Sequence, residues 1–186
     1  MKTLRFIGLA GSLRAASASH AILTSIGECL PPQVSLDALD IGALPHYCQD
    51  LEKGELPAAV IAARGRVEEA DAVIITLPEY NHGMPGVLKN ALDWLSRPVR
   101  ASCMMGKYVF FVSQSTGALG GVRAQYQLRE TLASMLCNMV PLPEIAISFA
   151  EQKIENGRLT DPATMAHIRA QLEVFLNVVE KNSTNG

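Results

Sequence analysis

The sequence lacks the features that several classes of protein require. Its four cysteines are widely spaced and form no Cys-x-x-Cys pair, which argues against a disulfide framework and favours unpaired thiols in an intracellular protein. A net charge of −2 provides no basic surface for nucleic acid or an anionic membrane. No apolar run approaches the ~20 residues of a membrane span, and the first residues lack a signal-peptide pattern. We therefore expect a cytoplasmic protein that binds neither nucleic acid nor a membrane.

Histidine is also scarce, and the chain shows no sign of a second domain. His20, His46 and His167 are scattered without the spacing of metal ligands, so we expect no metal site and interpret them as surface or loop residues. At 186 residues and 48% hydrophobic content, the chain is long enough for one well-filled core. There is no linker, repeat or low-complexity segment. We expect a single domain over residues 1–181, followed by a flexible tail at 182–186.

Short apolar runs alternate with longer amphipathic segments along the whole chain. Strands are expected at residues 4–10, 34–39, 72–77, 108–113 and 141–149. Helices are expected at residues 19–30, 57–70, 86–95 and 121–139, with a last helix beginning near residue 161. Strands that are nearly continuous in apolar residues are typical of a parallel sheet covered on both sides. This alternation predicts an α/β fold: a five-stranded parallel sheet with helices on both faces.

The most informative segment follows the third expected strand. It begins Pro78-Glu79-Tyr80-Asn81-His82 and lies at the carboxyl end of that strand, where open α/β sheets bind their ligands. It offers backbone amides and carbonyls and an aromatic ring, but no pair of nucleophile and base. These groups suit the holding of a flat polar heterocycle better than the hydrolysis of a bond.

The loop after the first expected strand is rich in hydroxyl groups. Ser12, Ser17 and Ser19 supply donors, Arg14 supplies a fixed positive charge, and the following helix begins with free backbone amides. An ordinary capped helix start is the alternative, because serine is a preferred N-cap. Neither Gly-x-Gly-x-x-Gly nor a Walker A motif is present. The loop therefore predicts a phosphate site of the flavodoxin-like type, with a mononucleotide at the switch point of the sheet.

Four motifs in order resemble the NADPH-dependent FMN reductase family, which includes flavin, quinone, chromate and azo reductases. The resemblance runs from about residue 4 to about residue 150, and a loop at residues 44–52 also takes part in it. The motifs are Gly11-Ser12-Leu13-Arg14-x-x-Ser17, Pro78-Glu79-Tyr80-Asn81, Pro85-Gly86-x-Leu88-Lys89-Asn90-Ala91-x-Asp93-Trp94 and Gly117-x-x-Gly120-Gly121-x-Arg123-Ala124-Gln125.

The resemblance implies a set of residues that bind FMN. It assigns the FMN phosphate to Ser12, Arg14 and Ser17, and to Ser19 where the family usually has asparagine. It assigns the ribityl chain and the ring to Pro78, Glu79, Tyr80 and Asn81. For the loop at 113–121, we expect backbone amides to contact the pyrimidine end of the ring, and glycines to permit the close approach. The residues expected there are Ser115, Gly117 and Gly120.

The resemblance also implies an activity. Hydride would pass from NADPH or NADH through flavin N5 to a quinone, a flavin or another small acceptor by a ping-pong mechanism, with no catalytic side chain required. A homodimer or homotetramer would assemble through the helix at residues 86–95 and its neighbour. An FMN-binding electron carrier or redox-sensing module is the alternative. The sequence fixes neither the physiological acceptor nor the choice between NADPH and NADH.

Individual side chains in these motifs have competing interpretations. Tyr80 fits a flavin contact and a subunit contact about equally well. His82 could act as a general acid, although hydride transfer does not need one in its first half. Glu79 fits a salt bridge better than catalysis. Trp94 is most simply a core residue, and Lys89 and Asp93 stand one helical turn apart, as an ion pair would.

Overall fold

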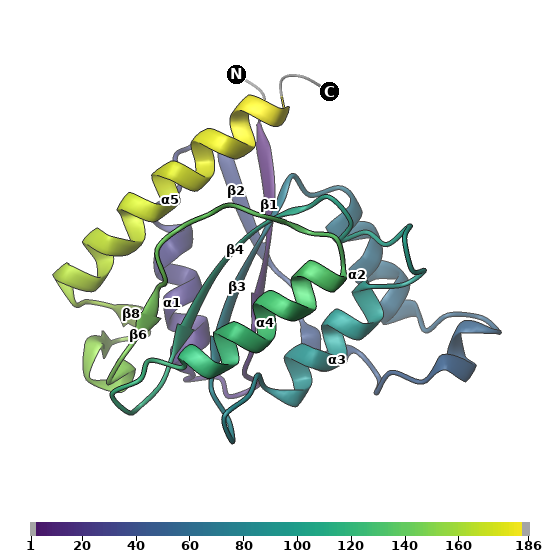
Figure 1. Ribbon diagram of the computed structural model, residues 1–186, viewed down its shortest axis with the longest axis horizontal. Helices are drawn as coiled ribbons and strands as arrows, with labels where there is room; N and C mark the ends of the chain where they lie inside the picture. The colour runs from purple at the N-terminus through teal and green to yellow at the C-terminus, as the bar shows by residue number, and fades with distance from the viewer. Residues whose placement is uncertain (1–2, 184–186) are drawn as a thin grey trace.

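The computed structural model describes residues 3–183 and has one parallel sheet at its centre (Figure 1). The strand order is β2-β1-β3-β4-β5, which is the order of flavodoxin-like sheets. The expected five-stranded parallel sheet is therefore confirmed. The strands are β1 (Leu4–Ala10), β2 (Val34–Ala38), β3 (Ala72–Pro78), β4 (Tyr108–Gln114) and β5 (Asn138–Met139), and a short β6 (Ala146–Ile147) also pairs with β4.

Helices cover both faces of the sheet, as the sequence predicts. In Figure 1, α1 (Ala18–Gly27) and α5 (Pro162–Ser183) lie on one side, and α2 (Ala58–Glu68), α3 (Gly86–Leu95) and α4 (Val122–Ser134) lie on the other. Alternate residues of β3 enter different cores: Ile74 packs with α1 and α5, and Ile75 packs with the other three helices. This alternation explains why β3 reads as a continuous apolar run, because both of its faces are buried.

The structure corrects two sequence-based predictions near the end of the sheet. The expected helix at 121–139 ends at Ser134, and residues 138–139 form β5 instead. The single strand expected at 141–149 is divided, so that β5 pairs with the start of β4 and β6 pairs with its end. Pro141 and Pro143 lie between the two pieces, and proline cannot donate a hydrogen bond to a sheet.

Short elements fill the connections between the main ones. Three 3-10 helices are η1 (Ile41–Ala43), η2 (Gln49–Glu52) and η3 (Ala150–Lys153). An antiparallel hairpin that the sequence did not predict joins β7 (Ile154–Glu155) to β8 (Arg158–Leu159). Asp161 caps α5, since its carboxylate accepts from the amide of Thr164 at 2.9 Å. The helix continues to Ser183, so residues 182 and 183 of the expected tail are helical, and residues 184–186 lie outside the described part.

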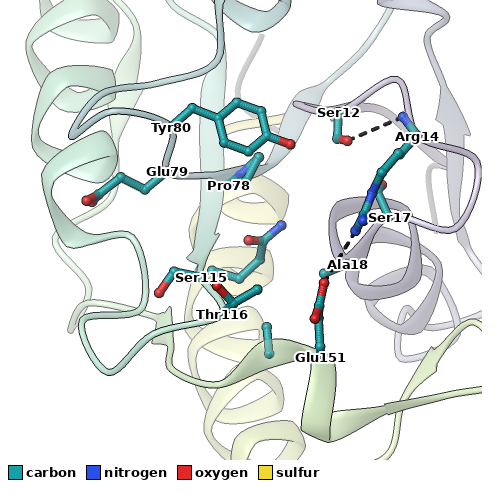
Figure 2. Close-up of a pocket in the computed structure, with 12 residues that line it drawn as sticks. Ser12, Arg14, Ser17, Ala18, Pro78, Glu79, Tyr80, Ser115, Thr116 and Glu151 are labelled. Atoms are coloured by element: carbon teal, nitrogen blue, oxygen red, sulfur yellow. Dashed lines mark hydrogen bonds and ion pairs between the residues drawn. The ribbon is translucent and has the colours of Figure 1, made fainter.

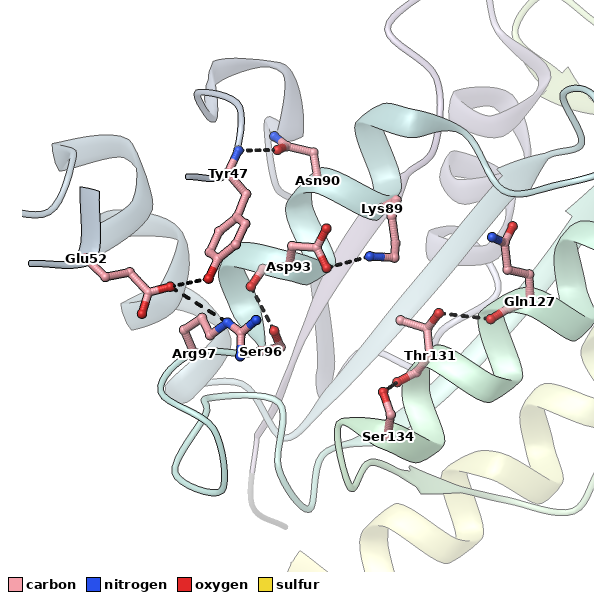
Figure 3. A network of polar contacts seen from close by, with 10 residues as sticks. All are labelled: Tyr47, Glu52, Lys89, Asn90, Asp93, Ser96, Arg97, Gln127, Thr131 and Ser134. Carbon is pink, nitrogen blue, oxygen red and sulfur yellow. Dashed lines mark hydrogen bonds and ion pairs between the residues drawn. The ribbon is translucent and has the colours of Figure 1, made fainter. Parts of the chain in front are cut away.

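A polar network fastens the loop after β2 to α3, and it gives several motif residues a structural role (Figure 3). The Asn90 amide oxygen accepts from the Tyr47 amide at 2.7 Å, and its nitrogen donates to the Pro45 carbonyl at 3.0 Å. The Trp94 indole also donates to Pro45, at 2.8 Å, while its ring is fully buried. Trp94 is thus a core residue of this chain.

Two further expectations concern charged and sulfur-containing side chains. Lys89 and Asp93 form the expected ion pair at 2.6 Å on α3. All four cysteines are free thiols, as the spacing predicts. Burial raises the pKa of Cys103 to about 11 and that of Cys137 to about 12, so both remain protonated at neutral pH.

Two further features concern membrane-spanning helices and groups of metal-ligating side chains. Over residues 3–183, none of the helices combines the length and apolar character needed to cross a bilayer. The same part of the chain contains no cluster of three or more histidine, cysteine or acidic side chains that could hold a metal ion.

A substitution at Gly120 tests the observed packing of β6, the second piece of the strand expected at residues 141–149. Its φ is +60°, and a Cβ there would lie 2.5 Å from the carbonyl carbon of Ala146. We expect Gly120→Ala to lower the free energy of unfolding by about 2–4 kcal/mol, because both the backbone strain and the clash with β6 must be relieved. Gly117→Ala is the control, since a Cβ there meets no atom within 4 Å. Equal urea midpoints for the two variants would contradict the observed packing of β6.

Candidate functional site

Three loops that follow β1, β3 and β4 meet at the carboxyl edge of the sheet and enclose a cavity of about 290 Å³ (Figure 2). This volume is at the lower end for small-molecule sites, so the cavity would hold one part of a nucleotide and leave the rest at the surface. The lining comes from these loops and from η3. The lining residues are Ser12, Arg14, Ser17, Ala18, Pro78, Glu79, Tyr80, Gln114, Ser115, Thr116, Ala150 and Glu151.

One end of the cavity has the donors that a phosphate needs. Ser12 and Ser17 are almost fully buried, and Ser17 is the N-cap of α1. The first amides of α1, those of Ala18 and Ser19, have no acceptor within the helix itself. Arg14 adds a guanidinium at the same end (Figure 2). Paired hydroxyls, free amides and one arginine suit a phosphate group.

His20 is a neighbour of this end that sequence reasoning placed only on the surface. Its Nδ1 lies 2.7 Å from the Ser17 hydroxyl, and its backbone amide donates to the same oxygen at 3.2 Å. A hydroxyl has one proton to donate. If Ser17 gives that proton to a phosphate, Nδ1 of His20 must carry its own hydrogen and donate to Ser17. The direction of the hydrogen bond between Ser17 and His20 thus depends on which ring nitrogen of His20 carries the hydrogen.

The loop after β3 closes the opposite side of the cavity. Pro78, Glu79 and Tyr80 line it, and the Tyr80 side chain is about half exposed, at 53%. Tyr80 and Gly83 exchange backbone hydrogen bonds of 3.0 Å around a tight turn. Asn81 and His82 occupy the turn with positive φ, as in a type I′ turn, and neither lines the cavity.

Glu79 forms the salt bridge expected for it, with Arg123, at 3.6 Å. Its other carboxylate oxygen accepts from the backbone amides of Arg123 and Ala124, at 3.0 and 3.3 Å. These amides belong to the first turn of α4, whose N-cap is Gly121 and has no side chain to cap the helix. Glu79 thus caps α4 from a neighbouring loop, and Figure 2 shows its carboxylate pointing away from the cavity.

Ser19 lies beneath the cavity and does not line it. Its side chain is fully buried, and its hydroxyl accepts from the amide nitrogen of Gln114 at 2.8 Å. Its carbonyl accepts from the Thr76 hydroxyl at 2.9 Å. The Ser19 hydroxyl therefore joins α1 to β4, and the Ser19 carbonyl joins α1 to β3. The backbone amide of Ser19 stays at the first turn of the helix.

The loop after β4 contributes fewer of its predicted residues. Ser115 lines the cavity, as does its neighbour Thr116. Gly117 and Gly120 do not: Gly117 accepts from the Phe149 amide at 3.1 Å, and Gly120 packs against the backbone of β6. Gly120 is therefore needed for the close packing of this loop on β6, whereas a Cβ at Gly117 would meet no atom within 4 Å.

Five lining residues were not predicted from the sequence. Ala18 and Thr116 adjoin predicted residues and could have been included on that ground. Gln114 is a polar residue at the end of an otherwise apolar strand, and this pattern in the sequence could have suggested a site residue. The structure shows that its side chain is buried. Ala150 and Glu151 come from η3, and the nearest predicted site residue, Gly120, is far from them in the sequence. None of the four motifs includes them.

Glu151 brings a second charge to the phosphate end. Its carboxylate lies 3.6 Å from the Arg14 guanidinium, and the two side chains are 60% and 66% exposed. Among the described residues that line the cavity, Arg14 carries the one positive charge, while Glu79 and Glu151 are both acidic. The cavity therefore has a single cation, and that cation already has a partner.

Comparison with known proteins places these features in context. A family model described as NADPH-dependent FMN reductase matches residues 4–153. An NAD(P)H-dependent FMN reductase of Pseudomonas aeruginosa is 37% identical over 173 residues, covering 92% of this chain and 93% of the relative. A quinone reductase of Escherichia coli is 34% identical, covering 96% of each chain.

A solved structure agrees with these sequence matches. The flavoenzyme FerB of Paracoccus denitrificans, an NAD(P)H:(acceptor) oxidoreductase, superposes with a TM-score of 0.87. It is 31% identical in sequence, and the alignment covers 96% of this chain and 98% of FerB. The likeness therefore extends over nearly the whole of both chains.

The role of Glu79 as a cap can be separated from a role in catalysis. We expect Glu79→Ala to lower the free energy of unfolding by about 1–2 kcal/mol, because two helix amides lose their acceptor. Glu79→Gln keeps a carbonyl oxygen in place and should cost less. Urea denaturation of both variants measures the effect. Loss of activity in Glu79→Ala with wild-type stability would instead indicate a chemical role.

Proposed function

Because the chain belongs to the NADPH-dependent FMN reductase family and is an oxidoreductase, we propose that it passes hydride from NAD(P)H through bound FMN to a small acceptor such as a quinone. The family match confirms the resemblance read from the four motifs. FMN, when bound, supplies the ability to take up a hydride and pass it on. The residues of this chain would bind FMN, orient it and leave its reactive edge exposed.

One observation carries the proposal. The start of α1, with Ser12, Arg14 and Ser17, faces a cavity whose other walls come from the loops after β3 and β4. The donors at one end fit a phosphate, and the opposite end is bounded by Pro78, Tyr80 and backbone, which fits a flat ring. A mononucleotide needs this combination of a polar end and a planar end. The residues present therefore fit FMN.

Some of these residues would hold the phosphate, and others would border the ring. Ser12, Arg14, Ser17 and the first amides of α1 would hold the phosphate. Tyr80 and the loop at 115–116 would border the ring from two sides. The other residues predicted to contact FMN, Ser19, Asn81, Gly117 and Gly120, do not line the cavity. We propose that they affect FMN binding only through the backbone conformation of their loops.

The small volume of the cavity bears on which acceptors can react, because it would leave part of the ring uncovered. A volume of about 290 Å³ leaves the ring edge accessible, so donor and acceptor would use one site in turn and give ping-pong kinetics. Quinones are the acceptor class we propose, in line with the name of the quinone reductase of Escherichia coli. Assembly as a homodimer or homotetramer stays a prediction, and either NADPH or NADH would serve as the hydride donor.

The visible absorption spectrum tests the proposed function directly. We expect the purified protein loaded with FMN to show flavin bands that bleach under anaerobic NADPH or NADH and return when a benzoquinone is added. Bands that persist with both nicotinamides but bleach with dithionite would favour an electron carrier or redox sensor. No bound flavin after incubation with FMN would contradict the assignment of the cavity.

Arg14 tests where the phosphate binds. We expect Arg14→Ala to weaken FMN binding by about ten- to a hundredfold, because a charge-assisted bond to phosphate is lost, and to leave the thermal midpoint unchanged. Riboflavin, which has no phosphate, should bind both proteins equally. Arg158→Ala is a matched control, since it also removes an arginine paired with a glutamate, Glu28, outside the cavity. An unchanged FMN affinity in Arg14→Ala would place the phosphate elsewhere.

A further inference from the structure

The phosphate end of the cavity contains a carboxylate that opposes its ligand. Figure 2 shows Glu151 on the same side as Arg14 and facing it. The separation of 3.6 Å makes them an ion pair, and both side chains are mostly in solvent. Such exposed pairs contribute little to stability. Glu151 is therefore free to affect ligand binding without a structural role to constrain it.

We infer that Glu151 competes with the phosphate for Arg14, and so limits both the affinity for FMN and the preference for FMN over flavins without a phosphate. The inference rests on the proposed function, which puts the phosphate at this end. It concerns a residue that lies outside the four motifs and comes from η3, a different element from those that supply the donors.

The argument depends on the charges that would meet at this point. An FMN phosphate is close to a dianion at neutral pH, and Arg14 is the one cation among the described residues that line the cavity. To bind phosphate, Arg14 must give up Glu151, which is then left unpaired beside the new negative charge. Binding therefore loses one attraction and gains one repulsion, and both effects come from the same carboxylate.

The hydroxyls and amides at this end are unaffected by the competition. Ser12, Ser17 and the start of α1 donate from fixed, buried positions, and they can bind phosphate whatever Glu151 does. Glu151 should thus reduce the affinity without abolishing it. The expected result is a flavin that binds specifically but exchanges with solution more readily than the donor set alone would allow.

Two flavins and a small set of variants test the inference. The full-length protein is stripped of flavin and titrated with FMN or riboflavin, with binding followed by quenching of flavin fluorescence. We expect Glu151→Gln to bind FMN about three- to tenfold more tightly than the wild type, from the removal of one charge in a solvent-exposed setting. Riboflavin affinity should change by less than about twofold. Glu155→Gln removes a charge from another exposed glutamate, outside the cavity, and should leave both affinities unchanged.

A double-mutant cycle shows whether the effect passes through Arg14. The gain from Glu151→Gln should be smaller in the Arg14→Ala background, because no cation remains to be released. Unchanged or weaker FMN binding by Glu151→Gln would overturn the inference, since the carboxylate would then be positioning Arg14 rather than competing for it. An equal gain for riboflavin would also overturn it.

Failure of the proposed function would give a different pattern. In that case the wild type would not bind FMN, or Arg14→Ala would bind it as tightly as the wild type does. A protein that binds FMN through Arg14, but whose affinity does not rise in Glu151→Gln, would contradict only the role of Glu151.

Discussion

A buried polar link between α1 and two central strands holds the site together. Thr76 of β3 donates to the carbonyl of Ser19, and Gln114 of β4 donates to its hydroxyl. All three side chains are buried, and loss of the Ser19 hydroxyl would leave the amide nitrogen of Gln114 without this acceptor in the interior. The link fixes the first turn of α1 above the ends of the strands. The free amides and the Ser17 cap are oriented by this anchoring, and so is the cavity that they face.

The register of the sheet is the second feature on which the site depends. Thr76 pairs with Ala10 on one side and Val112 on the other, so β1, β3 and β4 end at nearly the same level. Parallel strands place all three following loops at that edge. Each loop then has its own means of support: the Ser17 cap for the first, the Glu79 bridge to α4 for the second, and the backbone of β6 for the third. A site with these supports is preformed, and its ligand would not have to order it.

The charges of the site limit the affinity with which a flavin would bind under the proposed function. Under the proposed function, the buried hydroxyls and helix amides would bind phosphate without adding a net charge to the site. The single arginine is exposed and already paired with Glu151. The ring end offers Tyr80 and backbone but little enclosure. This arrangement suits an oxidoreductase whose ligands arrive and leave at an open edge, in keeping with relatives named for reducing flavins and quinones.

Much of this could be derived from the sequence alone. Apolar strands alternating with amphipathic helices determined the parallel sheet, because burial on both faces demands that pattern, and the loop motifs identified the family and the edge where ligands bind. Local composition also singled out Ser12, Arg14 and Ser17 as candidate phosphate donors, and all three line the cavity. Only the tertiary structure decided which of the motif residues face the cavity. Ser19 is turned inward to Gln114, and Gly120 serves the packing of β6. Glu151 is brought to Arg14 from a distant segment, because contacts of this kind depend on how separate elements pack and leave no periodic trace in the sequence.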